Sequence, residues 1–117
     1  MGILANIAVA AIAALHVYIL VLEMFLWESR GPKVFNLTPE FARASKALAA
    51  NQGLYNGFLA AGLFWGLWLG TSGHAIVIFF LLCVLVAGIY GAATVSRKIL
   101  YIQAIPALIA LALTLLV

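Results

Sequence analysis

An all-α fold built from four membrane-spanning helices is the fold class that the sequence predicts, and three observations lead to it. Hydrophobic residues make up 68% of the 117 residues and charged residues only 8%, whereas about a quarter of a soluble domain is charged. Four apolar stretches each approach the ~20 residues that a helix needs to cross a bilayer. All six lysines and arginines lie in two of the three connections between those stretches.

The basic connections set the orientation. Residues 71–74 carry no fixed positive charge, while residues 28–53 and 96–98 hold all of it. Loops rich in lysine and arginine remain on the cytoplasmic side of a membrane. We therefore expect both basic loops in the cytoplasm and both chain termini on the opposite side. The basic residues are Arg30, Lys33, Arg43, Lys46, Arg97 and Lys98.

We expect one transmembrane domain with spans at about residues 3–27, 54–70, 75–95 and 99–117. Gly31 and Pro32 are expected to end the first helical region. Thr38-Pro39-Glu40 has the residue order of a helix start, with a capping side chain, a proline and an acid in the first turn.

Residues 39–50 predict a short amphipathic helix on the cytoplasmic surface of the membrane, before the second span. Glu40, Arg43 and Lys46 share one of its faces and apolar residues occupy another, as in helices that lie in the interface. A straight helix from residue 39 to residue 70 would exceed the ~30 Å hydrocarbon core. We therefore expect a bend at Asn51-Gln52-Gly53.

Small residues recur at four-residue spacing and predict close helix packing. Such rows let helix backbones approach in a membrane, where apolar burial contributes little to association. We expect a tight four-helix bundle. The three rows are Gly53, Gly57 and Ala61; Gly62, Gly66 and Gly70; and Gly88, Ala92 and Ser96.

Polar residues inside the spans are the candidates for a functional site, because they are costly in hydrocarbon and are retained there for function. Most of them fall in the cytoplasmic half of the bilayer. We therefore expect a polar pocket around Glu23 that opens to the cytoplasm. The candidates are Glu23, His16, Asn51, Gln52, Tyr55, Asn56, Tyr90, Thr94, Arg97 and Gln103.

Two of these features have two interpretations. Glu23 can be a titrating carboxylate with His16 as a deeper proton partner, as proton-linked transport or catalysis needs, or it can pair with Arg97, Arg43 or Lys46 and serve assembly. The run from Asn51 to Gly57 can be an unwound helix that presents amides to a ligand. It can equally pack closely through its glycines and bond neighbouring helices through its amides.

Other classes of site are disfavoured. Cys83 is the only cysteine and the chain has two distant histidines, so we expect no intramolecular disulfide, no metal site and no cofactor. The net charge of +3 comes from loop residues, so no basic folded face is available for nucleic acid. The one-sided charge distribution argues against an antiparallel dimer and leaves a parallel homo-oligomer open.

Four sequence strings resemble a known family. They are Leu22-Glu23-Met24-Phe25-Leu26-Trp27, Lys33-Val34-Phe35, AANQGLYNGFLAAGL at residues 49–63 and AGIYGAATVSRKIL at residues 87–100. They are similar to strings of the small bacterial membrane proteins grouped as domain of unknown function 1304, DUF1304. The resemblance covers essentially the whole chain. It implies a four-span protein of the bacterial cytoplasmic (inner) membrane, and it brings no activity or residue role.

Three functional hypotheses follow. The first is binding or transport of a small molecule in a proton-linked way; the size and the single carboxylate of the first span are similar to those of small multidrug exporters. The second is a membrane-embedded enzyme acting on a lipid-like substrate. The third is a non-catalytic membrane subunit or scaffold. We favour the first, with the lipid bilayer as the main partner, and the sequence leaves the ligand and the oligomeric state open.

Overall fold

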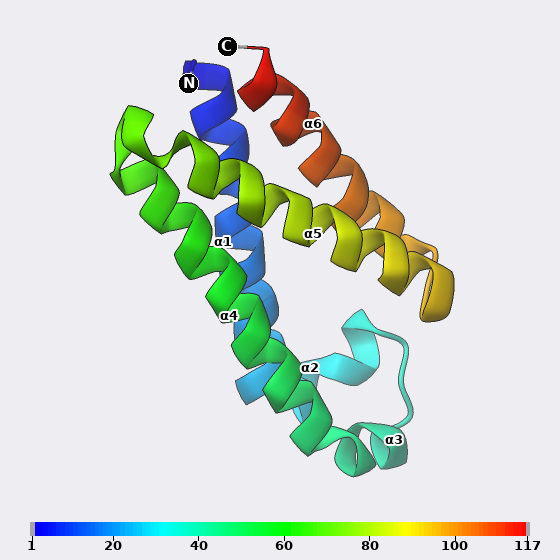
Figure 1. The fold of residues 1–117 in the computed structure, drawn as a ribbon. Helices are drawn as coiled ribbons and strands as arrows, with labels where there is room; N and C mark the ends of the chain where they lie inside the picture. Colours follow the sequence, from blue (N-terminus) through cyan, green and yellow to red (C-terminus); the bar gives the residue numbers. More distant parts are fainter. Residues whose placement is uncertain (1, 117) are drawn as a thin grey trace. The chain divides into compact units, whose positions relative to one another are not determined.

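The computed structural model describes residues 2–116, and these residues are helical almost throughout (Figure 1). The predicted all-α class is therefore confirmed. A 3₁₀-helix, η1 (Gly70–Gly73), connects α4 to α5, and a π-helix, η2 (Leu100–Ala104), leads into α6. The α-helices are α1 (Ile3–Phe25), α2 (Trp27–Val34), α3 (Pro39–Ala44), α4 (Lys46–Trp68), α5 (His74–Thr94) and α6 (Ile105–Leu115).

The chain forms two compact units. The central unit is Ala14–Phe58, and the terminal unit combines the chain up to Ala13 with the chain from Leu59 onward. Two helices, α1 and α4, contribute one half to each unit. The central unit contains the second half of α1, both short helices and the first half of α4.

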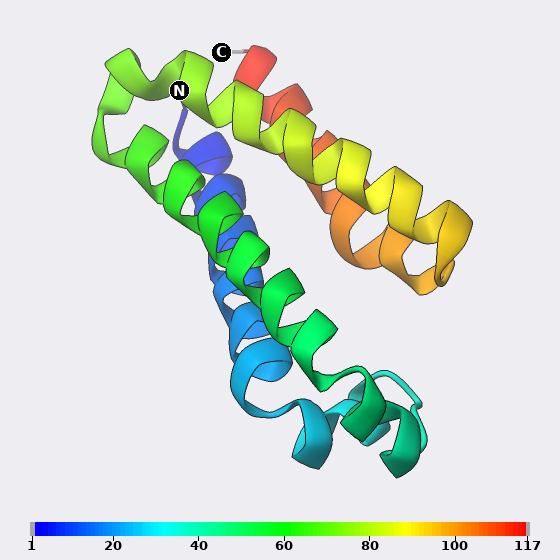
Figure 2. The ribbon, with the colours of Figure 1, turned by 60° about the horizontal axis from the view of Figure 1, so that its bottom comes forward.

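The terminal unit is organised around α5 and α6, which run side by side in opposite directions in both views (Figures 1 and 2). Its backbones are in close contact: a Cβ added at Gly88 of α5 would lie 2.7 Å from the backbone nitrogen of Ala104 in η2. Small residues therefore allow the close approach that the sequence predicted. The buried core consists of Val9, Ile12, Ala13, Leu63, Val77, Leu81, Val84, Ala107, Ala110 and Leu111.

The central unit uses glycines in the same way. A Cβ at Gly53 of α4 would lie 2.7 Å from Cγ of Met24 and 3.0 Å from Cβ of Glu23, both in α1. One turn later, a Cβ at Gly57 would lie 2.5 Å from Cδ1 of Leu20. Two members of the first small-residue row, Gly53 and Gly57, thus bring α4 against α1.

The expected bend at Asn51-Gln52-Gly53 is wrong, because α4 continues unbroken through that run. The helix is interrupted at Ser45 instead, between α3 and α4. The hydroxyl of Ser45 donates to the carbonyl of Phe41 at 2.7 Å, and serine favours helix ends because such local bonds compete with the backbone ladder. The amide of Asn51 also bonds back onto its own helix, donating to the carbonyl of Ala47 at 3.0 Å.

The expected stop at Gly31-Pro32 is also wrong. Both residues lie inside α2, and the helical region is interrupted earlier, at Leu26. A helical conformation before proline is disfavoured partly by a clash with the preceding Cβ, and Gly31 has no Cβ. The stop comes instead at Asn36, which has a φ of 57°, and the N–H of Leu37 returns to the carbonyl of Pro32 at 3.2 Å, as in glycine- or asparagine-terminated helices.

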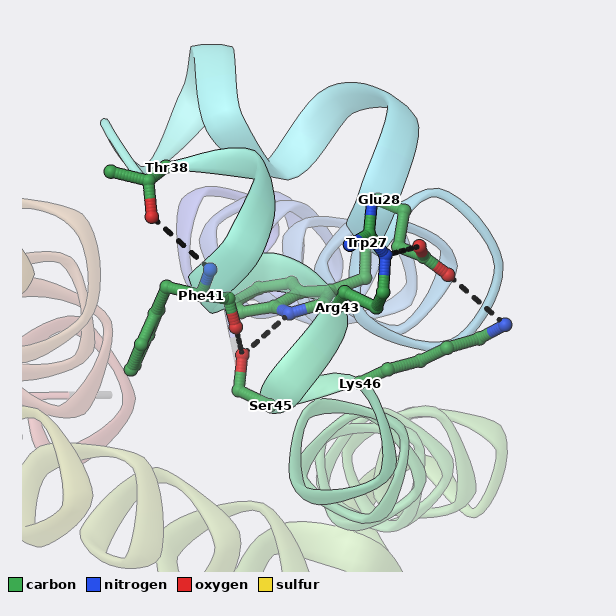
Figure 3. Close-up of polar contacts among 7 residues, drawn as sticks. All are labelled: Trp27, Glu28, Thr38, Phe41, Arg43, Ser45 and Lys46. Carbon is green, nitrogen blue, oxygen red and sulfur yellow. Dashed lines mark hydrogen bonds and ion pairs between the residues drawn. The ribbon is translucent and has the colours of Figure 1, made fainter.

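The predicted helix start at Thr38 is confirmed. Oγ1 of Thr38 accepts a hydrogen bond from the N–H of Phe41 at 3.1 Å (Figure 3). Pro39 and Glu40 occupy the first turn, as the sequence indicated. The helix is short, ending at Ala44, so the amphipathic stretch is divided between α3 and the start of α4.

The last helical region begins with a widened turn. The N–H of Ile105 donates to the carbonyl of Leu100, five residues back, and Pro106 follows immediately. A proline inside a helix clashes with the carbonyl four residues before it. The π-type turn lies directly before this proline.

Two helical stretches of the described chain are long and apolar enough to cross a membrane. They are Ile3–Phe25, with a mean hydropathy of 2.3, and Gly70–Thr94, with a mean hydropathy of 2.7. The stretch Leu100–Leu115 is also apolar but shorter.

Candidate functional site

Glu23 and Asn56 form a direct polar contact between α1 and α4 in the central unit. The side-chain nitrogen of Asn56 donates to Oε1 of Glu23 at 2.7 Å and to the carbonyl of Gln52 at 3.2 Å. Asn56 is buried, with 6% of its surface exposed, and Glu23 is half-buried. The structure therefore joins two of the residues that the sequence selected.

The local sequence explains how these two side chains meet. Gly53 precedes Asn56 by three residues, so both lie on neighbouring positions of one helix face. The missing side chain at Gly53 brings the α4 backbone against Glu23 and Met24. A short asparagine side chain can then reach a carboxylate on the facing helix.

His16 lies on the same helix as Glu23, closer to the N-terminus of α1. It is fully buried. Seven residues separate it from Glu23, which corresponds to nearly two turns and about 10 Å along the helix axis. The spacing keeps both residues on one side of α1.

The other candidates of α4 point to a more open environment. Asn51, Gln52 and Tyr55 are exposed, and the Tyr55 ring lies 6.0 Å from that of Phe58 on its own helix. Among the four polar candidates of this run, Asn56 is the one that contacts Glu23. The run is a continuous helix. Its glycines pack closely against α1 and Asn56 hydrogen-bonds to it, which is the packing alternative left open by the sequence.

Four candidates belong to the terminal unit. Thr94 donates its hydroxyl to the carbonyl of Tyr90 at 2.7 Å, Arg97 is exposed, and Gln103 is half-buried within η2. A shallow apolar hollow on α5 ends at Tyr90. It is lined by Phe79, Leu82, Cys83, Val86, Ala87 and Tyr90.

Sequence reasoning missed Glu28 and Ser45. The Glu28 carboxylate lies 3.2 Å from Nζ of Lys46 and 4.0 Å from Nε of Arg43, and the indole N–H of Trp27 donates to Oγ of Ser45 at 3.0 Å (Figure 3). Two of the three loop cations offered as partners of Glu23, Arg43 and Lys46, therefore pair with Glu28. The indole N–H of a partly buried tryptophan usually has a hydrogen-bond partner. Trp27 was therefore the one sequence feature that indicated the need for an acceptor such as Ser45.

The chemistry of the Glu23 site follows from its partner. The contacting group is an uncharged amide, so the carboxylate can take up or release a proton without breaking an ion pair. Within residues 2–116, no three histidine, cysteine or acidic side chains are grouped as a metal ion would require.

Fold and site together define an all-helical protein with two helices long and apolar enough to cross a membrane and a carboxylate–amide contact near the end of the first. The chain belongs to the family described as "Protein of unknown function (DUF1304)", whose model matches residues 10–115. It is 33% identical over 114 residues to the "Uncharacterized protein YpaA" of Lactococcus lactis subsp. lactis (strain IL1403), covering 95% of this chain and 96% of that protein. No solved structure matches it.

Proposed function

We propose that this chain is a multi-pass protein of the bacterial cytoplasmic (inner) membrane that binds or transports a small molecule in a proton-linked way. Its four spans would be those expected from the sequence, with a polar pocket around Glu23 open to the cytoplasm. The contact between Glu23 and Asn56 at 2.7 Å carries the proposal.

Apolar exposure supports the membrane placement. Only 28% of the most apolar part of α1 and 22% of that of α5 is buried within the molecule. Large exposed side chains continue on the other helices, among them Trp65 and Trp68 of α4 and Leu108 and Ile109 of α6. Each square ångström of such surface in water costs about 25 cal/mol, and a bilayer removes that cost. The 23 residues of α4 would extend about 34 Å at 1.5 Å per residue, enough for a third span.

The character of Glu23 supports proton linkage. A carboxylate within an apolar helix is costly, and such groups are typical of proton and substrate pathways. Its neutral partner keeps it available for proton exchange. Exposed Asn51, Gln52 and Tyr55 on α4 would extend the polar lining.

The small-residue rows give less support to a scaffold function. Gly53 and Gly57 lie against α1, Gly66 lies against α5 and η1, and Gly88 lies against η2, all within this chain. A protein partner would therefore need a different surface. A parallel homo-oligomer is compatible with this arrangement and remains part of the proposal.

Proton flux tests the proposal. Purified chain in proteoliposomes, with a pH-sensitive dye inside and a potassium diffusion potential across the membrane, is expected to show electrogenic proton uptake. Glu23→Gln keeps the shape of the side chain and its bond to Asn56 but cannot exchange a proton, so flux should fall to the level of empty vesicles. Glu28→Gln is the matched control and should retain flux. Equal flux in wild type and Glu23→Gln would rule out Glu23 as the proton-binding group.

A further inference from the structure

The four cations of the first basic loop fall into two pairs with different surroundings. Arg43 and Lys46 both lie against the carboxylate of Glu28. Arg30 and Lys33, on α2, are exposed, and neither makes a salt bridge within the described residues. The single carboxylate of Glu28 therefore offsets part of the charge of Arg43 and Lys46. Arg30 and Lys33 have no acidic partner among the described residues and remain available to an external anion.

Exposed apolar side chains accompany the available pair. Val34 and Phe35 directly follow Lys33 and are 37% and 40% exposed, and Phe41 of α3 is 56% exposed. The ring of Phe41 points away from the contacts made by Arg43 and Ser45 (Figure 3). Aromatic rings beside basic residues are typical of the headgroup level of a membrane, where ring and charge are both accommodated.

The segment that carries these residues is held in a defined shape. Trp27 bonds Ser45 and Glu28 pairs with Lys46, so the start of α2 is fastened to the junction of α3 and α4. The Trp27 ring also lies 5.2 Å from that of Phe35. A surface that is already ordered loses less conformational entropy when it binds.

We propose that Arg30, Lys33, Val34, Phe35 and Phe41 form a docking surface for anionic phospholipid headgroups on the cytoplasmic leaflet. The inference rests on the proposed membrane placement and adds a specific lipid partner to it. The cations would contact the headgroup phosphate and the apolar side chains would enter the upper acyl region. The surface begins within five residues of Phe25, where α1 ends, so it lies where an interfacial segment must be.

Lipid selectivity of the intact chain tests this surface. The protein is reconstituted into phosphatidylcholine vesicles, and the association of spin-labelled phosphatidylglycerol is compared with that of spin-labelled phosphatidylcholine. A lysine or arginine near an anionic surface changes association about fivefold. The Arg30→Gln/Lys33→Gln variant should therefore lose at least about fivefold in preference for phosphatidylglycerol. The matched variant Arg43→Gln/Lys46→Gln removes the same number of charges from the same loop and should lose much less.

The outcomes separate this proposal from the previous one. If both double variants lose the same preference for phosphatidylglycerol, the preference depends only on net charge, and the proposed docking surface is wrong. Wild-type protein that floats with the vesicles but shows no lipid preference would overturn the surface and leave the membrane placement intact. Wild-type protein that does not float with the vesicles would overturn both. A Phe41→Ala variant with a weakened preference would support the apolar part of the surface.

Discussion

At the scale of single residues, the contact between Asn56 and Glu23 is expected to contribute measurably to stability. Asn56→Ala leaves a half-buried carboxylate without its donor, and the free energy of unfolding should fall by about 1–3 kcal/mol. Unfolding in mixed detergent micelles, followed by circular dichroism, measures the change.

Asn51→Ala supplies the control for this prediction. Asn51 is exposed and bonds only to its own helix, so the loss should stay within about 0.5 kcal/mol. A double-mutant cycle with Glu23→Ala, which removes the acceptor of this hydrogen bond, should give a coupling of about 1 kcal/mol. A coupling of zero would contradict the role of this hydrogen bond in stability.

The sequence can select candidate residues where a polar side chain interrupts an apolar stretch. Glu23 and Asn56 stand out in the sequence because polar groups are rare in apolar stretches, but their hydrogen bond to each other is seen only in the structure. Glu28 did not stand out, since a loop acid looks like any solvated charge until the fold places it between Arg43 and Lys46. The ion pairs of Glu28 depend on how closely α2 approaches α3 and the start of α4, and no short-range sequence pattern predicts that approach.

At the scale of helices, the two glycines of α4 that face α1 should respond differently to alanine. Gly53→Ala would place a Cβ 3.2 Å from the backbone carbonyl oxygen of Leu20 and 3.0 Å from Cβ of Glu23. Neither atom can rotate away, so we expect a loss of about 1–3 kcal/mol in unfolding free energy.

Gly57→Ala is the matched comparison. Its Cβ would meet Cδ1 of Leu20, the flexible end of a side chain, and replacing a helical glycine gains about 0.5–1 kcal/mol. The net change should be near zero. Similar losses in the two variants, measured by the same unfolding assay, would contradict the difference between backbone and side-chain contacts.

The cap of α3 gives a local prediction. Thr38→Ala removes the acceptor for the N–H of Phe41, and loss of such a cap costs about 1 kcal/mol. Hydrogen exchange at the Phe41 amide should accelerate about fivefold, while amides of α5 exchange as before. Thr38→Ser preserves the hydroxyl and should exchange like wild type; an equal acceleration in both variants would contradict capping.

Helix ends were predictable when the signal was chemical and local. Thr38-Pro39-Glu40 marked a start correctly because a cap and a proline act within one turn. The interruption at Ser45 was missed and a bend was placed at Asn51-Gln52-Gly53, because glycine in sequence has two meanings. It loosens an isolated helix, yet at Gly53 it permits contact with α1, and only the facing helix decides between them.

At the scale of the whole molecule, the proposed orientation of the chain across a membrane can be tested directly. In a Cys83→Ala background, Ser29→Cys and Ser72→Cys place single thiols at exposed positions in the basic loop and in η1. The basic loop should remain in the cytoplasm because lysine and arginine resist translocation. A membrane-impermeant maleimide added to spheroplasts should therefore label Ser72→Cys and spare Ser29→Cys until the membrane is opened. The reverse pattern would invert the proposed topology.

The division of the chain into a contiguous central unit and a discontinuous terminal unit sets an order of events during synthesis. Residues 14–58 contain every segment of the central unit, so that unit can assemble while the second half of the protein is still being translated. The first half of α1, including Val9 and Ile12, belongs to a core that is completed by Leu63 of α4 and by residues of α5 and α6. These early residues must therefore wait for their core partners until almost the entire chain has left the ribosome.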